Sequence, residues 1–176
     1  MLLIGLCGRA QVGKDTIGAY LIKHHGFKRF GIADYVKQVA ELAGWNGIKD
    51  ERGRTYLNHI GDAMREYDPE IMLKHLVTKI KYYEHICEQN GMPDVRVVIT
   101  DARMEPEMRW IKSVGGSLWL VLRDVEDQSI PAHATEKADK VDRSMFEFVF
   151  ENNGSFSSLY SGVHQAIEAT VKNVKS

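Results

Sequence analysis

A short apolar run, a glycine-containing loop and a helix-forming segment follow one another at the start of the chain. Residues 2–7 read LLIGLC, and Gly8 and Gly13 then enclose four residues directly before Lys14. Glycines permit backbone angles that turn several N–H groups inward around a phosphate, and the positive end of the following helix points at the same spot. Lys14 adds a mobile positive charge. This order of segments predicts a phosphate-binding loop, or P-loop, at the edge of an α/β sheet.

The residue after the lysine departs from the usual motif. Asp15 stands where serine or threonine is common, and the hydroxyl comes one position later, at Thr16. Because residues 14–16 begin a helix, Thr16 still presents its hydroxyl and N–H to a phosphate. Asp15 either lies near Mg²⁺ through water or simply favours the helix N-terminus as an acidic residue. We therefore expect Mg²⁺ at Asp15 and Thr16, and nucleotide contacts from Gly8, Ala10, Val12, Gly13, Lys14, Asp15 and Thr16.

Short apolar segments alternate with helix-like segments along most of the chain. Strands are expected at 2–7, 27–32, 95–100, 117–122 and 145–150. Helices are expected at about 14–25, 34–43, 55–65, 105–114 and 155–174, with one more that starts at Asp68-Pro69 and ends before NGMPD. The polar stretch 45–54 is expected to be a loop. Such alternation implies an α/β fold with a parallel sheet covered on both faces.

Ligands of parallel sheets bind beyond the carboxyl ends of the strands. Five groups of residues are expected to follow those ends and to converge on one crevice: 8–16, 33–37, 101–103, Arg123 and 152–154.

Composition excludes some classes of protein. The chain has 176 residues, enough for one domain, with 23 Lys and Arg against 24 Asp and Glu. A balanced charge argues against a non-specific nucleic-acid binder. No apolar run approaches the ~20 residues that a membrane helix needs. Cys7 and Cys87 have no metal-ligand spacing, and MLLIGLC is too short for a signal peptide, so we expect a cytoplasmic protein, in the host cytoplasm if it is viral.

Six segments in a fixed order carry a family resemblance. They are GKDT at 13–16, FGIADYVKQVA at 30–40, LNHIGDAMREYDPEIMLKHL at 57–76, VVITDARMEPEMRWIKSVGG at 97–116, HATE at 133–136 and FVFENNGSFSSL at 148–159. Together they resemble the phage and bacterial deoxynucleoside monophosphate kinases, a branch of the P-loop nucleoside monophosphate kinases, from residue 2 to about residue 165. The chain is shorter than that family between residues 44 and 54.

The resemblance implies a fold and an activity. The fold is a single three-layer P-loop domain over residues 1–176, with a five-stranded parallel sheet, helices on both faces, an acceptor-binding region at about 33–88 and a lid at about 124–143. ATP lies on the P-loop with Mg²⁺, and its γ-phosphoryl group passes to a deoxynucleoside monophosphate.

Charge neutralisation and positioning dominate phosphoryl transfer, so several cations are expected around the phosphates. By the resemblance, the catalytic residues are Lys14, Arg103 and Arg143, and Arg123 and Asn153 contact the donor nucleotide. The acceptor residues are Val36, Lys37, Arg54, Gly61, Asp62, Arg65, Asp101, Arg103 and Glu107.

Each of these assignments has an alternative. Asp101 holds Mg²⁺, fixes the acceptor sugar or Arg103, or merely caps the end of its strand. Lys37, Arg54, Arg65 and Glu107 are also explained as solvent-facing residues. Trp45 is either a core residue or stacks on the acceptor base.

Two other functions remain open at this stage. One is another P-loop small-metabolite kinase, for dephospho-coenzyme A or phosphomevalonate. The other is a non-catalytic nucleotide-binding regulator, although the chain lacks the Asn-Lys-x-Asp guanine signature. A small-molecule acceptor is the expected partner, with no nucleic acid and no membrane, and a homodimer is left open.

Overall fold

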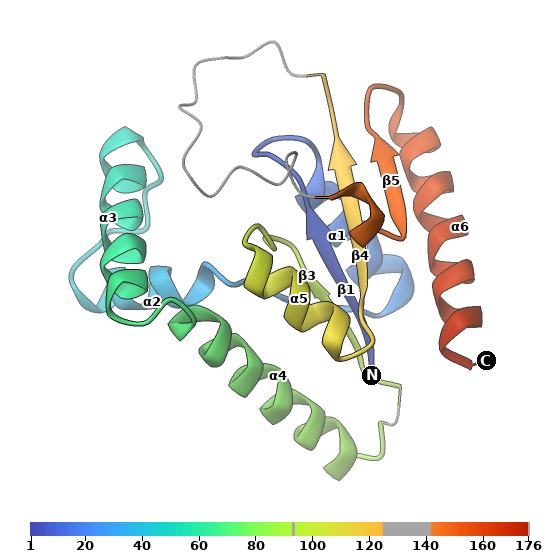
Figure 1. Ribbon diagram of the computed structural model, residues 1–176, viewed down its shortest axis with the longest axis horizontal. Coiled ribbons are helices and arrows are strands. Elements are labelled where there is room, and N and C mark those ends of the chain that lie inside the picture. The colour runs from blue at the N-terminus through green and yellow to red at the C-terminus, as the bar shows by residue number, and fades with distance from the viewer. Residues whose placement is uncertain (93, 125–141, 176) are drawn as a thin grey trace. The chain divides into compact units, whose positions relative to one another are not determined.

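Five strands form one sheet in the order β2-β3-β1-β4-β5 (Figure 1). The computed structural model describes residues 1–92, 94–124 and 142–175. The strands are β1 (Leu2–Cys7), β2 (Lys28–Phe30), β3 (Arg96–Ile99), β4 (Ser117–Leu122) and β5 (Phe148–Glu151). β1 pairs in parallel with β3 and β4, and β4 pairs in parallel with β5. The predicted five-stranded parallel sheet is confirmed, with β1 at its centre.

The residues of the described chain divide into two compact units. The first is Met1–Arg29 with Asp94–Ser176, and the second is Phe30–Pro93. The sequence range of the second unit includes the predicted acceptor region at 33–88. That residues 1–176 form a single domain stays a prediction. Residues 125–141, which include most of the predicted lid and the HATE segment, lie outside the described residues.

Helices cover both faces of the sheet in the first unit. On one face, Ile4 and Leu6 of β1 share a buried core with residues of α1 (Lys14–His25) and α6 (Phe156–Lys175). On the other face lies α5 (Glu105–Ser113). Gly5 faces α5 so closely that a Cβ there would lie 2.6 Å from Cδ1 of Ile111. The three-layer arrangement expected from the sequence is therefore present.

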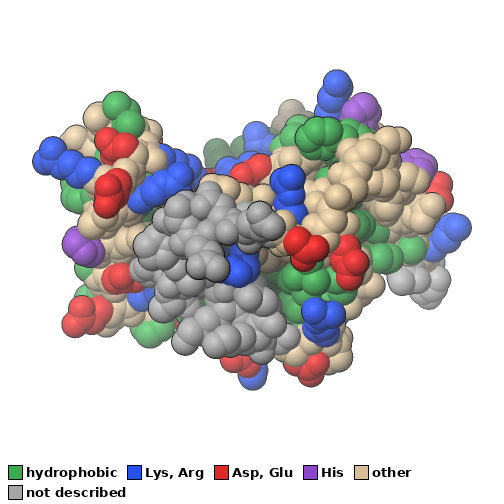
Figure 2. Space-filling view, turned by 90° about the horizontal axis from the view of Figure 1, so that it is seen from above, with side chains coloured by type: hydrophobic (Ala, Val, Ile, Leu, Met, Phe, Trp, Pro, Cys, Tyr) green, Lys and Arg blue, Asp and Glu red, His purple; other side chains and the backbone are tan. Residues whose placement is uncertain are grey.

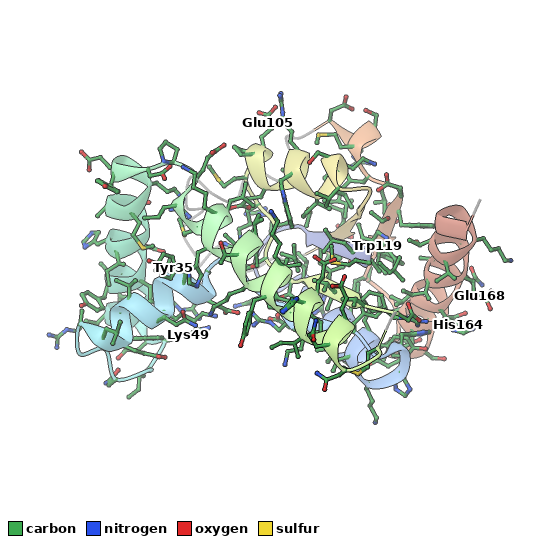
Figure 3. The ribbon with its side chains drawn as sticks, turned by 90° about the horizontal axis from the view of Figure 1, so that it is seen from below. Tyr35, Lys49, Glu105, Trp119, His164 and Glu168 are labelled. Atoms are coloured by element: carbon green, nitrogen blue, oxygen red, sulfur yellow. The ribbon has the colours of Figure 1, made fainter. Side chains whose placement is uncertain are left out.

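Trp119 is the largest fully buried side chain of the first unit. It lies on the sheet in the interior (Figure 3) and contacts the rings of Phe148 and Phe150 on the neighbouring strand. Aromatic pairs of this kind add to the hydrophobic stabilisation of a core. The side chain of Trp119 therefore stabilises the pairing of β4 with β5.

The second unit contains three helices, α2 (Asp34–Leu42), α3 (Glu51–Tyr67) and α4 (Ile71–Gln89). Each of them contacts the other two. Val36 and Ala40 of α2 and Met72, Leu76 and Ile80 of α4 are buried. Tyr35, labelled in Figure 3, stacks on His75 with ring centroids 3.8 Å apart. α2 and α4 bury apolar residues at helical spacing, as their sequence patterns predict, whereas the buried residues of α3 are Gly53 and Gly61.

The start of α3 differs from the prediction. Residues 51–54 were expected in a loop, but the helix begins at Glu51, and Asp50 caps it by accepting a hydrogen bond from the N–H of Gly53 at 2.7 Å. The loop was expected from the polar composition of this stretch, which includes Gly53. In the structure the glycine is a packing requirement, because a Cβ at Gly53 would lie 2.0 Å from the carbonyl oxygen of Ile48.

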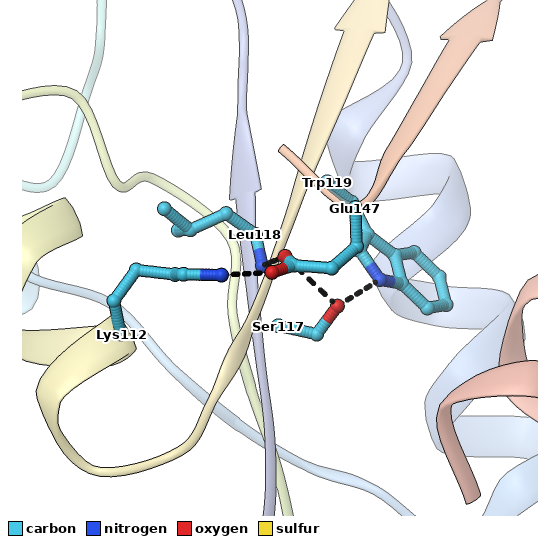
Figure 4. Close-up of polar contacts among 5 residues, drawn as sticks. All are labelled: Lys112, Ser117, Leu118, Trp119 and Glu147. Atoms are coloured by element: carbon cyan, nitrogen blue, oxygen red, sulfur yellow. Dashed lines mark hydrogen bonds and ion pairs between the residues drawn. The ribbon is translucent and has the colours of Figure 1, made fainter. Parts of the chain in front are cut away.

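The start of β5 also differs. The expected strand at 145–150 is replaced by a short 3₁₀ helix, η2 (Arg143–Met145), and a strand that begins at Phe148. Glu147, just before the strand, joins a polar network (Figure 4). Its carboxylate accepts hydrogen bonds from the N–H of Leu118 at 2.7 Å and from Lys112. It also contacts the hydroxyl of Ser117, which accepts from the indole N–H of Trp119 at 2.9 Å.

None of the helices in the described ranges has the length and apolar character needed to cross a bilayer.

We expect Glu147→Ala to lower the free energy of unfolding by ~1–3 kcal/mol, because it leaves the buried N–H of Leu118 without its acceptor. Glu147→Gln keeps an oxygen for that N–H and should cost less. The measurement is urea unfolding. The control is Glu105→Ala, which removes an exposed carboxylate paired with Arg109. Equal losses in Glu147→Ala and Glu105→Ala would contradict the role given to the network.

Candidate functional site

The P-loop joins β1 to α1 along a path that admits no side chains at its two glycines. Gly8 has φ 134° and Gly13 has φ 107°, angles that L-residues rarely adopt. A Cβ at Gly8 would lie 2.3 Å from the carbonyl oxygen of Val121, and one at Gly13 would lie 2.3 Å from Nδ2 of Asn152. The loop is anchored by Val12, whose side chain is buried in the core, while Ala10 is half-buried. The sequence motif is thus matched by the expected loop geometry.

α1 begins at Lys14, directly after this loop. The first N–H groups of a helix have no acceptor within the helix, and they carry its positive end. Asp15 is exposed and Thr16 is half-buried in this first turn. The turn therefore offers N–H donors, one hydroxyl and one carboxylate at the mouth of the loop.

Lys14 is a buried cation. Its side chain is only 7% exposed, and its ammonium donates a hydrogen bond to the carbonyl of Gly8 at 2.8 Å and another to that of Arg9. Burial, followed by the positive charge of Arg103, lowers the pKa of Lys14 from 10.5 to about 8, although the carboxylates of Asp15 and Asp101 oppose the shift. The structure therefore brings Lys14, Asp101 and Arg103 into one electrostatic cluster, as predicted for the first unit.

Glu107 fixes the turn that carries Arg103. Its carboxylate accepts hydrogen bonds from the N–H groups of Arg103 and Met104, both at 2.8 Å, and its side chain is 7% exposed. Glu107 is the third residue of α5, so these bonds form the acidic half of a capping box. The alternative of a solvent-facing glutamate is wrong. A direct contact between Glu107 and substrate stays a prediction.

Both cysteines are buried free thiols. Burial, aided by the charge of Glu107, raises the pKa of Cys7 to about 12. A thiol with so high a pKa is a poor nucleophile and metal ligand. Cys7 is therefore a packing residue beneath the P-loop.

Two consecutive asparagines follow β5. Asn152 donates from Nδ2 to the carbonyl of Val12 at 2.8 Å. Asn153 accepts from the N–H of Asp124 and donates to its carboxylate, both at 2.8 Å. Asn153 was the predicted nucleotide contact, and the structure places it beside Arg123, which is exposed after β4. Residues 152–154 were expected to converge with the loop at 8–16, and Asn152 does contact it, although the bond to Val12 itself was not predicted.

The acceptor candidates of the second unit lie where α2 meets α3. A Cβ on Gly61 would lie 3.4 Å from Nη1 of Arg65 and 3.7 Å from Cγ2 of Val36, so these three residues are neighbours. Arg65 pairs with Asp62 at 3.3 Å. Lys37, the residue after Val36, pairs with Asp34 at 2.7 Å. This part of the second unit holds two cations beside a small residue.

Two other predicted cations, Arg54 and Arg143, lie outside this contact between α2 and α3. Arg54 is exposed in the first turn of α3 and donates from Nε to the carbonyl of Lys49 at 3.1 Å. Arg143 is exposed in η2, which leads into the amino end of β5, whereas the P-loop follows the carboxyl end of β1. The roles of Arg54 and Arg143, and the convergence of residues 33–37 with the other groups, stay predictions.

The second unit also has an open cavity of about 990 Å³ next to the loop between α2 and α3. Trp45, Tyr56 and His59 are among the residues that line it. The indole N–H of Trp45 donates to the carbonyl of Ile48 at 3.1 Å, which holds the ring in place. Trp45 is half-buried at this cavity and is not a core residue.

Charges of both signs are interspersed on the face shown in Figure 2. Lys and Arg side chains alternate there with Asp and Glu side chains, which matches the balanced composition.

The sequence is similar over nearly its full length to one curated protein. That protein, from Acanthamoeba polyphaga mimivirus, is named "Putative deoxynucleotide monophosphate kinase" and is 28% identical, with 96% of this chain and 97% of the relative covered. No family model matches the chain. The resemblance stated from the motifs is thereby confirmed.

Solved structures agree on the fold. Shikimate kinase from Aquifex aeolicus superposes with a TM-score of 0.51 at 12% identity, covering 97% of this chain and 98% of that one. Dephospho-CoA kinase from Campylobacter jejuni superposes with a TM-score of 0.52 at 14% identity, with the same coverage. The chain has the fold of the P-loop small-molecule kinases.

The pKa of Lys14 predicts how stability depends on pH. Between about pH 8 and pH 10.5 the unfolded chain binds more protons at residue 14 than the folded chain. The stability of the wild type should therefore rise relative to that of Lys14→Met across this window, by about 3 kcal/mol in total. Chemical unfolding at pH 7.5 and pH 9.5 measures most of the change. A constant difference between the two proteins would contradict a desolvated ammonium.

Proposed function

From the P-loop kinase fold and the full-length similarity to a deoxynucleotide monophosphate kinase, we propose that this protein is a phosphotransferase. It transfers the γ-phosphoryl group of ATP to a deoxynucleoside monophosphate and releases the diphosphate. The observation that carries the proposal is Lys14, a buried cation at the P-loop that interacts with both Asp101 and Arg103.

The donor side fits a nucleoside triphosphate. The glycine backbone and the first turn of α1 offer N–H groups to the β- and γ-phosphates, and these groups bind anions without any side chain. Lys14 lies at the loop with a lowered pKa, so a polyphosphate that approaches it raises that pKa and stabilises the charged form. ATP binding and the protonation of Lys14 therefore support each other.

The same turn fits Mg²⁺. The hydroxyl of Thr16 and the carboxylates of Asp15 and Asp101 are hard oxygen ligands, which Mg²⁺ prefers. Bound Mg²⁺ would neutralise charge on the β- and γ-phosphates. Of the two carboxylates, Asp101 follows a buried strand and is half-buried, so it is the better-fixed one.

The chemistry requires little beyond charge and position. An oxygen of the acceptor phosphate attacks the γ-phosphorus, and the bond from that phosphorus to the bridging oxygen of ADP breaks. The acceptor phosphate has a second pKa near ~6, so it is already ionised at pH 7 and needs no general base. Lys14 and Arg103 stabilise the charge that spreads over the transferred group, and Glu107 holds the backbone that carries Arg103.

On the acceptor side, we propose that Lys37 and Arg65 bind the acceptor phosphate. Arg65 approaches the buried Gly61 where α2 meets α3, and Lys37 follows Val36, which contacts the same glycine. Both are paired with an aspartate on their own helix, so each is already oriented. Asp101 and Arg103 stay predicted nucleotide contacts. Buried free thiols accord with a cytoplasmic location.

The experiment that tests the proposal is an acceptor panel with labelled ATP. It contains the four deoxynucleoside monophosphates, dephospho-coenzyme A and phosphomevalonate. We expect label in at least one deoxynucleoside diphosphate, and we expect Lys14→Ala to lower that rate at least ~100-fold. Label only in a non-nucleotide acceptor would support another small-metabolite kinase. ATP binding without any labelled acceptor would support the nucleotide-binding regulator.

Replacing Lys37 should separate acceptor binding from donor binding. We expect Lys37→Ala to raise the KM for the acceptor about 10-fold and to leave the KM for ATP unchanged, because a charge-assisted hydrogen bond to the acceptor phosphate is lost. The control is Lys81→Ala, which removes an exposed lysine of α4 in the same unit. Steady-state kinetics with either substrate varied decide the question. An unchanged acceptor KM would remove Lys37 from the site.

A further inference from the structure

Asn152 holds the P-loop from the side of the neighbouring strands. We propose that Asn152 is a positioning residue for the donor phosphates: its hydrogen bond to the carbonyl of Val12 aims the N–H of Gly13 at them. This inference rests on the proposed function, because it concerns the binding of ATP. Asn152 itself need not touch the nucleotide.

One peptide plane links Val12 to Gly13. The carbonyl of Val12 and the N–H of Gly13 belong to the same planar peptide unit, and in a trans peptide they point in opposite directions. Nδ2 of Asn152 donates to the Val12 carbonyl at 2.8 Å, so that carbonyl faces Asn152. The N–H of Gly13 therefore faces away from Asn152. In a loop of this type, N–H groups on that side are the ones that surround a phosphate.

The asparagine is itself fixed by the sheet. Its backbone N–H donates to the carbonyl of Leu122 at 2.7 Å, and the residue before it, Glu151, pairs with Leu122 in the register of β4 and β5. Asn153 adds two hydrogen bonds to Asp124 in the same turn. The side chain of Asn152 thus reaches the P-loop from a rigid base.

The P-loop needs such an external bond. Glycine at position 13 permits positive φ, but it also permits other orientations of the adjacent peptide. The close approach of Asn152 to Gly13, where a Cβ would lie 2.3 Å from Nδ2, shows that the two residues pack directly against each other. A hydrogen bond that selects one orientation before ATP arrives reduces the ordering cost of binding.

A direct contact between Asn152 and the adenosine part of ATP would have a different signature. Inorganic tripolyphosphate carries the phosphates without the nucleoside. If Asn152 acts on the peptide of Gly13, its loss weakens tripolyphosphate and ATP equally. If it acts on adenosine, its loss weakens ATP alone.

The test is calorimetric binding of ATP and of tripolyphosphate to the wild type and to two variants. We expect Asn152→Ala to weaken both ligands about 10-fold. Asn152→Asp keeps the shape but puts a carboxylate oxygen against the Val12 carbonyl, so its loss should be larger. In steady-state kinetics, Asn152→Ala should raise the KM for ATP and leave the KM for the acceptor within about 2-fold.

The matched control is Ser155→Ala, three residues further along. Ser155 caps α6 by accepting from the N–H of Ser158 at 3.2 Å, so its loss lowers the melting temperature without touching the P-loop. We expect ligand binding as in the wild type. Unchanged tripolyphosphate binding in both Asn152 variants, or an equal loss in Ser155→Ala, would overturn the inference. A wild type that binds ATP but labels no acceptor would instead contradict the proposed transfer alone.

Discussion

The backbone of the P-loop passes so close to β4 that residue 8 has no space for a side chain, and the rest of the site depends on this approach. A Cβ at Gly8 would meet the carbonyl oxygen of Val121 at 2.3 Å. Because β1 lies between β3 and β4, the loop after β1 has the ends of both strands beside it. Asp101 and Arg103 follow the end of β3, and Arg123 follows the end of β4. The parallel sheet therefore assembles the charged cluster from segments far apart in the sequence.

The cluster is costly to the folded chain. Lys14 is desolvated and lies near a second cation, which is why its pKa falls to about 8. Groups held in an unfavourable electrostatic state are typical of sites that gain their full interactions only with a ligand. The surrounding structure offsets this cost by fixing the backbone. Glu107 orders the turn of Arg103 and Asn152 orders the peptide of Gly13, each through hydrogen bonds at 2.8 Å. Both side chains act on loops that present other groups.

Sequence reasoning was strongest where a local signal decides the structure. β1, α1 and β4 have the predicted ends, since an apolar run bounded by glycines or charges leaves few alternatives. It failed at α3, where Gly53 serves packing against Ile48 and does not break the helix. It failed at β5 because Glu147 bonds to β4 before the strand begins. The cap at Glu107 had a sequence signal, a glutamate at the third helical position. For Asn152, its place after a strand predicted the approach to the P-loop, but nothing in the sequence indicated the bond to Val12, 140 positions away.

The two units differ in how much chemistry the sequence can reveal. The donor side is built mostly from backbone, and only a few residue types permit that backbone, so Gly8, Gly13 and Lys14 suffice to indicate it. Solved kinases with different names share this fold at 12% and 14% identity, which shows how little of it depends on the remaining residues. The acceptor side is built from helices whose packing admits many side chains. In our proposal the acceptor specificity rests on a few individual groups, among them Lys37 and Arg65, and their roles have to be decided by substitution and not by pattern.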